Sequence, residues 1–270
     1  MRAVRWTWAA AVFAAAIVLP LCWAVLASVT PEDRLFTITS FVPRGLVLEH
    51  YRALFSGRDF WTPIRNSLIV AGATTILSVA LGAVSAYALA RLAFRGKTPA
   101  LAFVLAVSMY PQISIVSPLF LLLRELHLLN TYGGLVLPYL TFSMPLAIWL
   151  LVGFFRQLPV DLEDAAMVDG ASRIRTLWEI VLPLSRPALA TTAILTFLYS
   201  WNEFLFALSF TLGPERYTVP VAIALFRGQY QVPWGEILAG AVVATTPVAV
   251  IVFVAQRRII AGLTSGAVKG

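Results

Sequence analysis

Six apolar and almost uncharged stretches set the strongest constraint on how this chain can fold. They run over residues 6–29, 66–90, 98–123, 128–155, 187–212 and 237–256, and a helix crosses about 30 Å of hydrocarbon with about 20 residues. Hydrophobic residues make up 60 % of the 270 residues and charged residues 12 %, more apolar than a soluble core requires. In lipid, the backbone N–H and C=O groups of such runs form their hydrogen bonds within helices. We therefore predict an all-α integral membrane protein with six transmembrane helices.

The distribution of basic residues predicts the orientation of these spans. An even number of spans places both termini on one side, which would carry twelve Lys and Arg against five Asp and Glu. The opposite side would carry eight against seven. Because Lys and Arg are held back on the cytoplasmic side, we expect cytoplasmic termini and a cytoplasmic 156–186 loop. The net charge of +7 is then explained by topology, and we expect no nucleic-acid partner, because no basic patch is interleaved with aromatics.

Residues that carry catalytic or metal chemistry do not cluster in the sequence. The two histidines, His50 and His127, fall in expected outer loops, and the single cysteine, Cys22, lies inside the first span. The stretch Gly96-Lys-Thr ends like a phosphate-binding loop, but Arg91 stands where that loop needs its first glycine. We expect no enzyme, no metal site and no cofactor bound by this chain.

The most organised polar stretch, residues 162–171, lies between two spans. Asp161 could cap a short helix there, with Asp164 as the capping-box acid, and Gly170 would end it. Ser172 could then cap a second helix that ends near Pro183. So short a helix is unstable alone in water, and its flat alanine face suits a groove on a partner. The alternative is an amphipathic loop resting on the lipid surface.

The fifth apolar stretch contains Glu203, the only acid within a span. An unpaired carboxylate in hydrocarbon is costly, so this residue should face a pathway or a partner, or be protonated. Its neighbours Tyr199, Trp201 and Asn202 could offer hydroxyl, amide and aromatic contacts to a solute. A polar clamp between helices is the alternative for part of this group, because adjacent helical residues point in different directions.

The 156–186 segment resembles the EAA loop in permease subunits of binding-protein-dependent ABC importers. That pattern reads Glu-Ala-Ala, three residues, Gly, nine residues and Ile-x-Leu-Pro. Here Asp164-Ala165-Ala166, Gly170 and Ile180-Val-Leu-Pro183 match every spacing, with Asp164 in place of the usual Glu. Ser200-Trp-Asn-Glu-Phe204 is similar to a stretch of carbohydrate importers. The end of the chain, residues 256–270, is similar to the tail of the second permease of maltose and trehalose systems.

This resemblance implies the type I importer (MetI-like) permease fold and a subunit of an ATP-driven sugar importer in a bacterial inner or plasma membrane. The partners implied are a second, different permease, a homodimer of cytoplasmic ATPase subunits that bind ATP and Mg, an extracytoplasmic sugar-binding protein, and membrane lipid. The resemblance also implies two groups of residues that contact the ATPase. They are a coupling helix (Glu163, Asp164, Ala165, Ala166, Met167, Asp169, Gly170 and Ala171) and the tail (Thr264, Ser265, Gly266, Ala267, Val268 and Lys269).

Two other functions are weighed against this one. A secondary transporter would be expected to carry paired charges within its spans and internal symmetry, whereas only Glu203 lies within a span. An ABC permease for a solute other than a sugar is the second alternative. Among sugars, trehalose and maltose are the expected substrates, and the loop between Gly213 and Gly235 could touch the binding protein.

Overall fold

The computed structural model describes residues 2–36, 45–226 and 232–264, with side chains described from residue 12 to residue 256 of these ranges. Within them the regular secondary structure is helical throughout. The chain divides into two compact units, one of residues 1–64 and 219–247 and the other of residues 65–218 and 248–270.

The first unit is held together by contacts among its loops and short helices. It contains α1 (Arg2–Ser28), η1 (Glu32–Arg34), α2 (Glu49–Arg52), η2 (Ala53–Gly57), α12 (Val219–Ala224) and the first part of α13 (Trp234–Thr264). The Glu32 carboxylate accepts hydrogen bonds of 3.0 Å from the backbone N–H groups of Trp234 and Gly235, where a carboxylate suits the positive end of a helix. Arg58 pairs with Glu236, so two carboxylates fix the start of α13.

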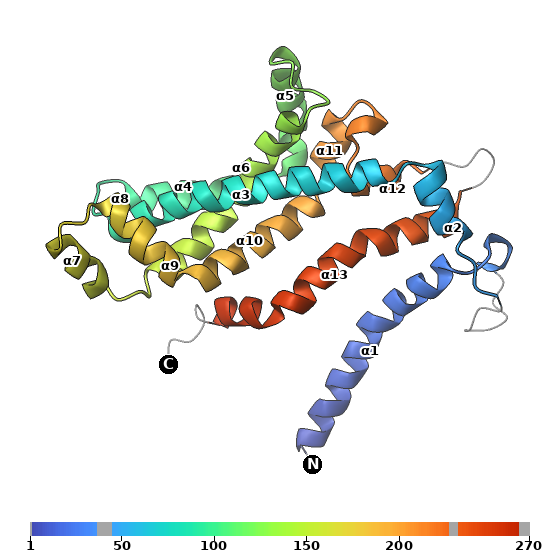
Figure 1. Ribbon diagram of the computed structural model, residues 1–270, viewed down its shortest axis with the longest axis horizontal. Coiled ribbons are helices and arrows are strands. Elements are labelled where there is room, and N and C mark those ends of the chain that lie inside the picture. The colour runs from blue at the N-terminus through green and yellow to red at the C-terminus, as the bar shows by residue number, and fades with distance from the viewer. Residues whose placement is uncertain (1, 37–44, 227–231, 265–270) are drawn as a thin grey trace. The chain divides into compact units, whose positions relative to one another are not determined.

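The second unit contains the remaining helices, drawn in Figure 1. They are α3 (Trp61–Arg91, which begins in the first unit), α4 (Lys97–Ser108), α5 (Gln112–Glu125), α6 (Tyr132–Phe155), α7 (Asp161–Val168), α8 (Arg173–Thr176), η3 (Leu177–Val181), α9 (Leu182–Leu184), α10 (Arg186–Trp201), α11 (Leu205–Phe210) and η4 (Pro214–Arg216). Helix α6 contacts both α4 and α10, so it forms the centre of this unit.

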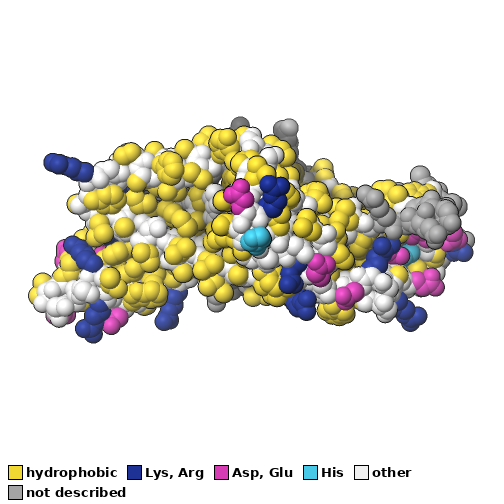
Figure 2. All heavy atoms as spheres, turned by 90° about the horizontal axis from the view of Figure 1, so that it is seen from above, with side chains coloured by type: hydrophobic (Ala, Val, Ile, Leu, Met, Phe, Trp, Pro, Cys, Tyr) yellow, Lys and Arg dark blue, Asp and Glu magenta, His cyan; other side chains and the backbone are white. Residues whose placement is uncertain are grey.

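Three described helices are long and apolar enough to cross a membrane by themselves: α3, α6 and the Trp234–Gln256 part of α13. Two bent pairs pass the same test and bring the number up to five; α4 and α5 meet at 91°, and the Arg173–Leu184 segment meets α10 at 81°. The stretch Val12–Ser28 is a shorter apolar helix. Figure 2 shows hydrophobic side chains over most of the visible surface, as expected for a protein in lipid.

The bend between α4 and α5 falls at an identifiable residue. Helix α4 ends at Ser108 and α5 begins after Pro111, a residue without a backbone donor that cannot continue a helix. The expected 98–123 span is therefore two helices at a large angle. The second bend lies between Leu184 and the start of α10 at Arg186, just before the expected 187–212 range. That range holds α10 and α11, with residues 202–204 between them. A proline within an apolar stretch accounts for a break in the helix, but the sequence did not predict a bend of this size.

Small residues at four-residue spacing, Ser78, Gly82 and Ala86, bring α3 and α6 close together. The hydroxyls of Ser78 and Ser143 are 2.7 Å apart and buried. A Cβ atom on Gly82 would lie 3.0 Å from the Cβ of Ala147, closer than most such atoms approach. Ala86 is completely buried. These two helices therefore pack almost backbone to backbone.

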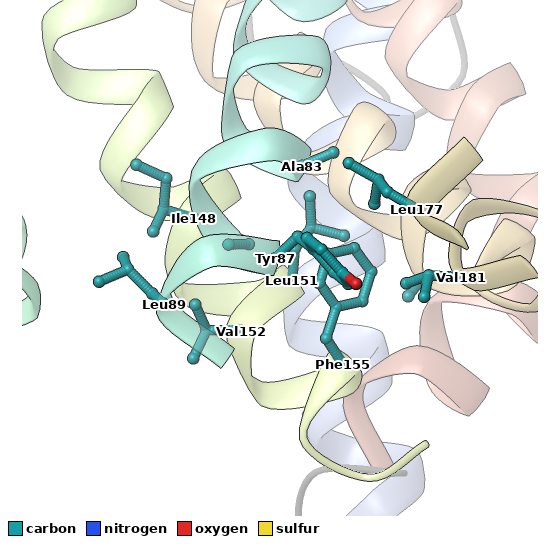
Figure 3. Close-up of a cluster of buried hydrophobic side chains, with 11 residues drawn as sticks. Ala83, Tyr87, Leu89, Ile148, Leu151, Val152, Phe155, Leu177 and Val181 are labelled. Atoms are coloured by element: carbon teal, nitrogen blue, oxygen red, sulfur yellow. The ribbon is translucent and has the colours of Figure 1, made fainter. Parts of the chain in front are cut away.

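A buried apolar cluster lies at the Arg91 end of α3 (Figure 3). Tyr87 and Leu89 of α3 pack there with Leu151 and Phe155 of α6. The remaining members come from α3, α6, α10 and η3, namely Ala83, Ala86, Ile148, Val152, Ala188, Leu177 and Val181. Because Leu177 and Val181 enter this cluster, the segment after α7 is fixed to the helices by burial of apolar surface.

Candidate functional site

The segment between α6 and α10 contains the organised polar stretch. It folds as α7, a short turn, and a second helical run through α8, η3 and α9 to Leu184. Ser172 caps this second run by accepting a hydrogen bond of 3.3 Å from the Arg175 N–H. The predicted arrangement of helix, turn and helix is therefore observed, with a π-turn at η3 that places Leu177 and Val181 in the core.

The start of α7 differs from the prediction. The helix begins at Asp161 after Val160, which makes no side-chain cap, so the prediction that Asp161 caps the helix is wrong. Val160 already has a helical backbone conformation, and its carbonyl accepts from the N–H groups of Glu163 and Asp164 at 2.8 and 3.1 Å. Three acids in the first turn still suit the positive end of the helix.

The end of α7 is as predicted. Gly170 has φ +85°, the left-handed conformation that glycine adopts cheaply. Its N–H donates to the Met167 carbonyl at 3.1 Å, and the Ala171 N–H donates to the Ala166 carbonyl at 2.9 Å. This pair of bonds is the Schellman motif, which satisfies the last carbonyls of a helix.

The two faces of α7 differ in exposure. Glu163 and Ala166 are buried, at 2 % and 8 % exposure. Val168 is 88 % exposed and Leu162 44 %. The expected contact residues Asp164, Ala165, Asp169 and Gly170 are exposed, while Met167 and Ala171 are half-buried. The exposed residues of α7 and its C-cap therefore include three acids, Asp161, Asp164 and Asp169, beside small and apolar residues.

The buried Glu163 carboxylate is held by side chains of α3. Arg91 Nε lies 2.6 Å from Glu163 Oε1, and the Tyr87 hydroxyl donates to Oε2 at 3.0 Å. Arg91 also donates through Nη2 to the Leu158 carbonyl at 2.7 Å. Both charged side chains of this pair are more than nine-tenths buried. The sequence predicted none of these partners; the available signal was that Arg91 directly follows the uncharged 66–90 stretch.

The expected pathway residues occupy different surroundings. Glu203 is 7 % exposed, and its carboxylate accepts from the Phe206 and Ala207 N–H groups at 2.8 and 3.1 Å. It therefore satisfies backbone N–H groups in the first turn of α11. Trp201 is buried and stacks on Phe197, with ring centroids 5.7 Å apart.

Tyr199 and Asn202 are the more accessible members of this group. The Tyr199 hydroxyl accepts a hydrogen bond from the Gln112 side chain at the start of α5. Asn202 is exposed and donates to the Leu198 carbonyl at 2.7 Å. The structure thus brings Tyr199 to the bend between α4 and α5, a contact that the sequence did not predict.

A polar network holds the 213–217 loop at the other end of α3. The buried Asn66 side chain donates to the carbonyls of Glu215 and Tyr217 at 3.0 Å and accepts from the Tyr132 hydroxyl at 2.8 Å. A hydrogen bond from Asn130 lowers the pKa of the exposed Glu215 carboxyl. The sequence did not predict this role of Asn66 either.

Two expected contact regions lie partly outside the described residues. In the 213–235 loop these are residues 227–231, which include Arg227, Tyr230 and Gln231. In the tail they are Ser265, Gly266, Ala267, Val268 and Lys269. Thr264 is the last residue of α13.

Comparison with known proteins identifies the class of protein that this helical arrangement represents. The family described as "Binding-protein-dependent transport system inner membrane component" matches residues 78–265. The chain belongs to this family. A bacterial ABC transporter involved in the import of the acidic polysaccharide alginate contains a chain of similar fold, with a TM-score of 0.79, 21 % identity and coverage of 94 % of this chain and 95 % of that one.

Relatives of higher identity are permeases of sugar systems. The trehalose transport system permease protein SugB of Mycobacterium tuberculosis (strain CDC 1551 / Oshkosh) is 45 % identical, over 93 % of this chain and 92 % of the relative. The trehalose/maltose transport system permease protein MalG of Thermococcus litoralis is 43 % identical, over 93 % and 91 %. The sulfoquinovosyl glycerol transport system permease protein SmoH of Agrobacterium fabrum is 40 % identical, over 93 % and 88 %.

Proposed function

We propose that this chain is a non-catalytic membrane permease subunit of an ATP-driven importer for a disaccharide of the trehalose or maltose kind. It contributes half of the translocation pathway, and a second, different permease contributes the other half. The observation that carries this proposal is α7: a short helix with an exposed acidic and apolar face, ended by a left-handed glycine, in a chain whose relatives are permeases of trehalose and maltose systems.

In this proposal the exposed face of α7 docks on a cytoplasmic ATPase subunit. Asp164 and Asp169 offer charge to a basic partner, and Val168 offers an apolar anchor at its 88 % exposure. An eight-residue helix is unstable alone, but the core contacts of η3 hold the segment in place before the partner binds. ATP and Mg belong to the ATPase dimer, and the 264–269 tail is its second contact.

The proposed topology has six spans with both termini in the cytoplasm of a bacterial inner membrane. The bent pair α4 and α5 forms one span, and α10 with α11 forms another, so that the breaks at 109–111 and 202–204 lie within the membrane. Irregular backbone is tolerated at that depth where it is buried in protein or faces a water-filled cavity. Tyr199 and Asn202, at these breaks, face the sugar pathway, while Glu203 and Trp201 support the break from inside.

Transport then follows alternating access. Closure of the ATPase dimer on ATP moves the coupling helices, and the attached helix groups rearrange so that the pathway opens toward the sugar-loaded binding protein. Hydrolysis returns the complex to the inward-open state. The chain transmits motion, and its energetic contribution lies in docking contacts.

The test is the ATPase activity of the complete complex in lipid vesicles, with the binding protein loaded in turn with trehalose, maltose and sucrose. We expect stimulation by trehalose or maltose and accumulation of the same sugar inside the vesicles. A complex stimulated only by a solute without sugar rings would contradict the proposed substrate. Failure to assemble with any ATPase subunit would contradict the proposed class.

A further inference from the structure

Glu163 is the charged residue of α7 that the helix turns away from solvent. Both oxygens of its carboxylate accept hydrogen bonds from α3, one from the Arg91 Nε–H at 2.6 Å and the other from the Tyr87 hydroxyl at 3.0 Å. The Glu163 side chain is only 3 % exposed, so its carboxylate is not accessible to a partner protein in this conformation. Breaking such a pair leaves an uncompensated buried charge, which is strongly unfavourable. The pair therefore holds α7 to α3 in one geometry.

Arg91 makes this joint rigid. The same guanidinium reaches Glu163 of α7 and the Leu158 carbonyl of the preceding loop, so two points of the segment are fixed to one side chain. The planar fork of arginine permits both bonds at once, whereas a lysine ammonium is a point charge. Arg173 of α8 also lies beside the Tyr87 hydroxyl. Side chains of α3 thus lie against both α7 and α8.

Helix α3 is suited to carry motion away from this joint. Among the described helices longer than 20 residues, it alone has no proline beyond its first turn. From Asn66 to Arg91 it rises about 37 Å at 1.5 Å per residue. At the Asn66 end it holds the carbonyls of Glu215 and Tyr217. One uninterrupted helix therefore contacts α7 at one end and the 213–217 loop at the other.

We infer that α3 is the rigid link between the coupling helix and the 213–217 loop, and that Glu163 and Arg91 are positioning residues of this link. This inference rests on the proposed function and revises the role of one residue. Glu163 does not contact the ATPase; it holds α7 so that Asp164 and Val168 do. Movement of α7 is transferred to α3 through the buried pair, and α3 displaces the loop held by Asn66.

The test measures sugar transported per ATP hydrolysed in vesicles that contain the complete complex and loaded binding protein. Arg91→Lys keeps the charge but cannot make both Arg91 contacts, and Glu163→Gln removes the charge at nearly constant volume. Loss of a hydrogen bond to a charged group lowers the corresponding equilibrium constant by about tenfold. We expect the amount of sugar transported per ATP to fall by about the same factor in each variant. Asn66→Leu, at the far end of α3, should lower the same ratio.

The matched control is Glu179→Gln. Glu179 pairs with Arg175 at 2.8 Å in the same segment, but both side chains are more than half exposed, and exposed pairs contribute little. We expect a wild-type ratio for this variant. The amount of ATPase subunit that copurifies with each variant is the second readout, because Glu163→Gln should retain the ATPase if Glu163 does not contact it.

Three results separate the possibilities. An unchanged ratio in both Arg91→Lys and Glu163→Gln would overturn the inference. Loss of the ATPase subunit from Glu163→Gln but not from Arg91→Lys would also overturn it, because it would make Glu163 a docking residue. If the wild-type complex shows no stimulation by any loaded binding protein, the proposed function fails on its own and before any variant is compared.

Discussion

Gly170 shows how one backbone angle sets the end of α7. Its φ of +85° costs about 1–2 kcal/mol for a residue with a Cβ, although no atom lies within 4 Å of the position such a Cβ would take. The restriction on this residue therefore comes from its own backbone. Neighbouring side chains do not contribute to it.

We predict that Gly170→Pro abolishes transport while the membrane helices stay folded. Proline fixes φ near −65° and removes the N–H that donates to Met167, so the Schellman motif cannot form. Uptake of labelled sugar by cells, together with the helical circular dichroism of the purified complex, measures both effects. Gly170→Asn is the control, since asparagine tolerates the left-handed region. Normal transport by Gly170→Pro would contradict the prediction.

Glu163 and Asp164 show a second effect at the scale of single residues. They are adjacent acids of the same helix, yet Glu163 is 2 % exposed and Asp164 is exposed, because successive helical residues point about 100° apart. The motif alone treats both as acids of a docking helix. Their different burial follows from the presence of Arg91 and Tyr87 on one side of α7.

At the scale of elements, the close packing of α3 on α6 depends on Gly82. An alanine there would place its Cβ 3.0 Å from the Cβ of Ala147, while its next contacts in α6 would be ordinary at 3.6 Å. Overpacking of this kind costs about 1–3 kcal/mol. The crowding comes from one atom of Ala147.

We predict that Gly82→Ala lowers the thermal unfolding temperature of the purified complex and that adding Ala147→Gly restores most of the loss. Removing the Ala147 Cβ removes the crowding atom, so the two changes should not be additive. Gly72→Ala is the matched control on the same helix, because nothing lies within 4 Å of its new Cβ. Equal unfolding temperatures for Gly72→Ala and Gly82→Ala would show that α3 and α6 are not tightly packed at this point.

At the scale of the whole molecule, the bend between α4 and α5 decides the topology. A 91° angle between two apolar helices is compatible with a broken span or with a re-entrant loop. The proposed six-span topology requires a broken span. Arg95 precedes this pair and Glu125 ends it, and both residues are exposed.

We predict that Arg95 and Glu125 lie on opposite sides of the membrane. In a Cys22→Ser background, Glu125→Cys should react with a membrane-impermeant maleimide applied outside spheroplasts. Arg95→Cys should react only after the membrane is permeabilised. Labelling of both cysteines from the outside, or of neither, would make the pair a re-entrant loop and would leave an odd number of spans.

Much of the candidate site could be predicted from the sequence because it depends on local rules. The helix end at Gly170 and the cap at Ser172 involve bonds between residues at most five positions apart, and residue type alone favours them. The start of α7 was misplaced by one residue, since Val160 takes up the helical conformation without a side-chain cap.

The sequence by itself determined that this chain is an apolar helical protein, where its long helices lie, and which short polar segment ends at Gly170. These properties follow from composition and from contacts within a few residues. Only the tertiary structure decided that Arg91 and Tyr87 meet Glu163, which is 72 positions away from Arg91, and that Asn66 holds a loop 149 positions away. Such pairs are set by how helices pack, and packing brings together residues that no local pattern connects.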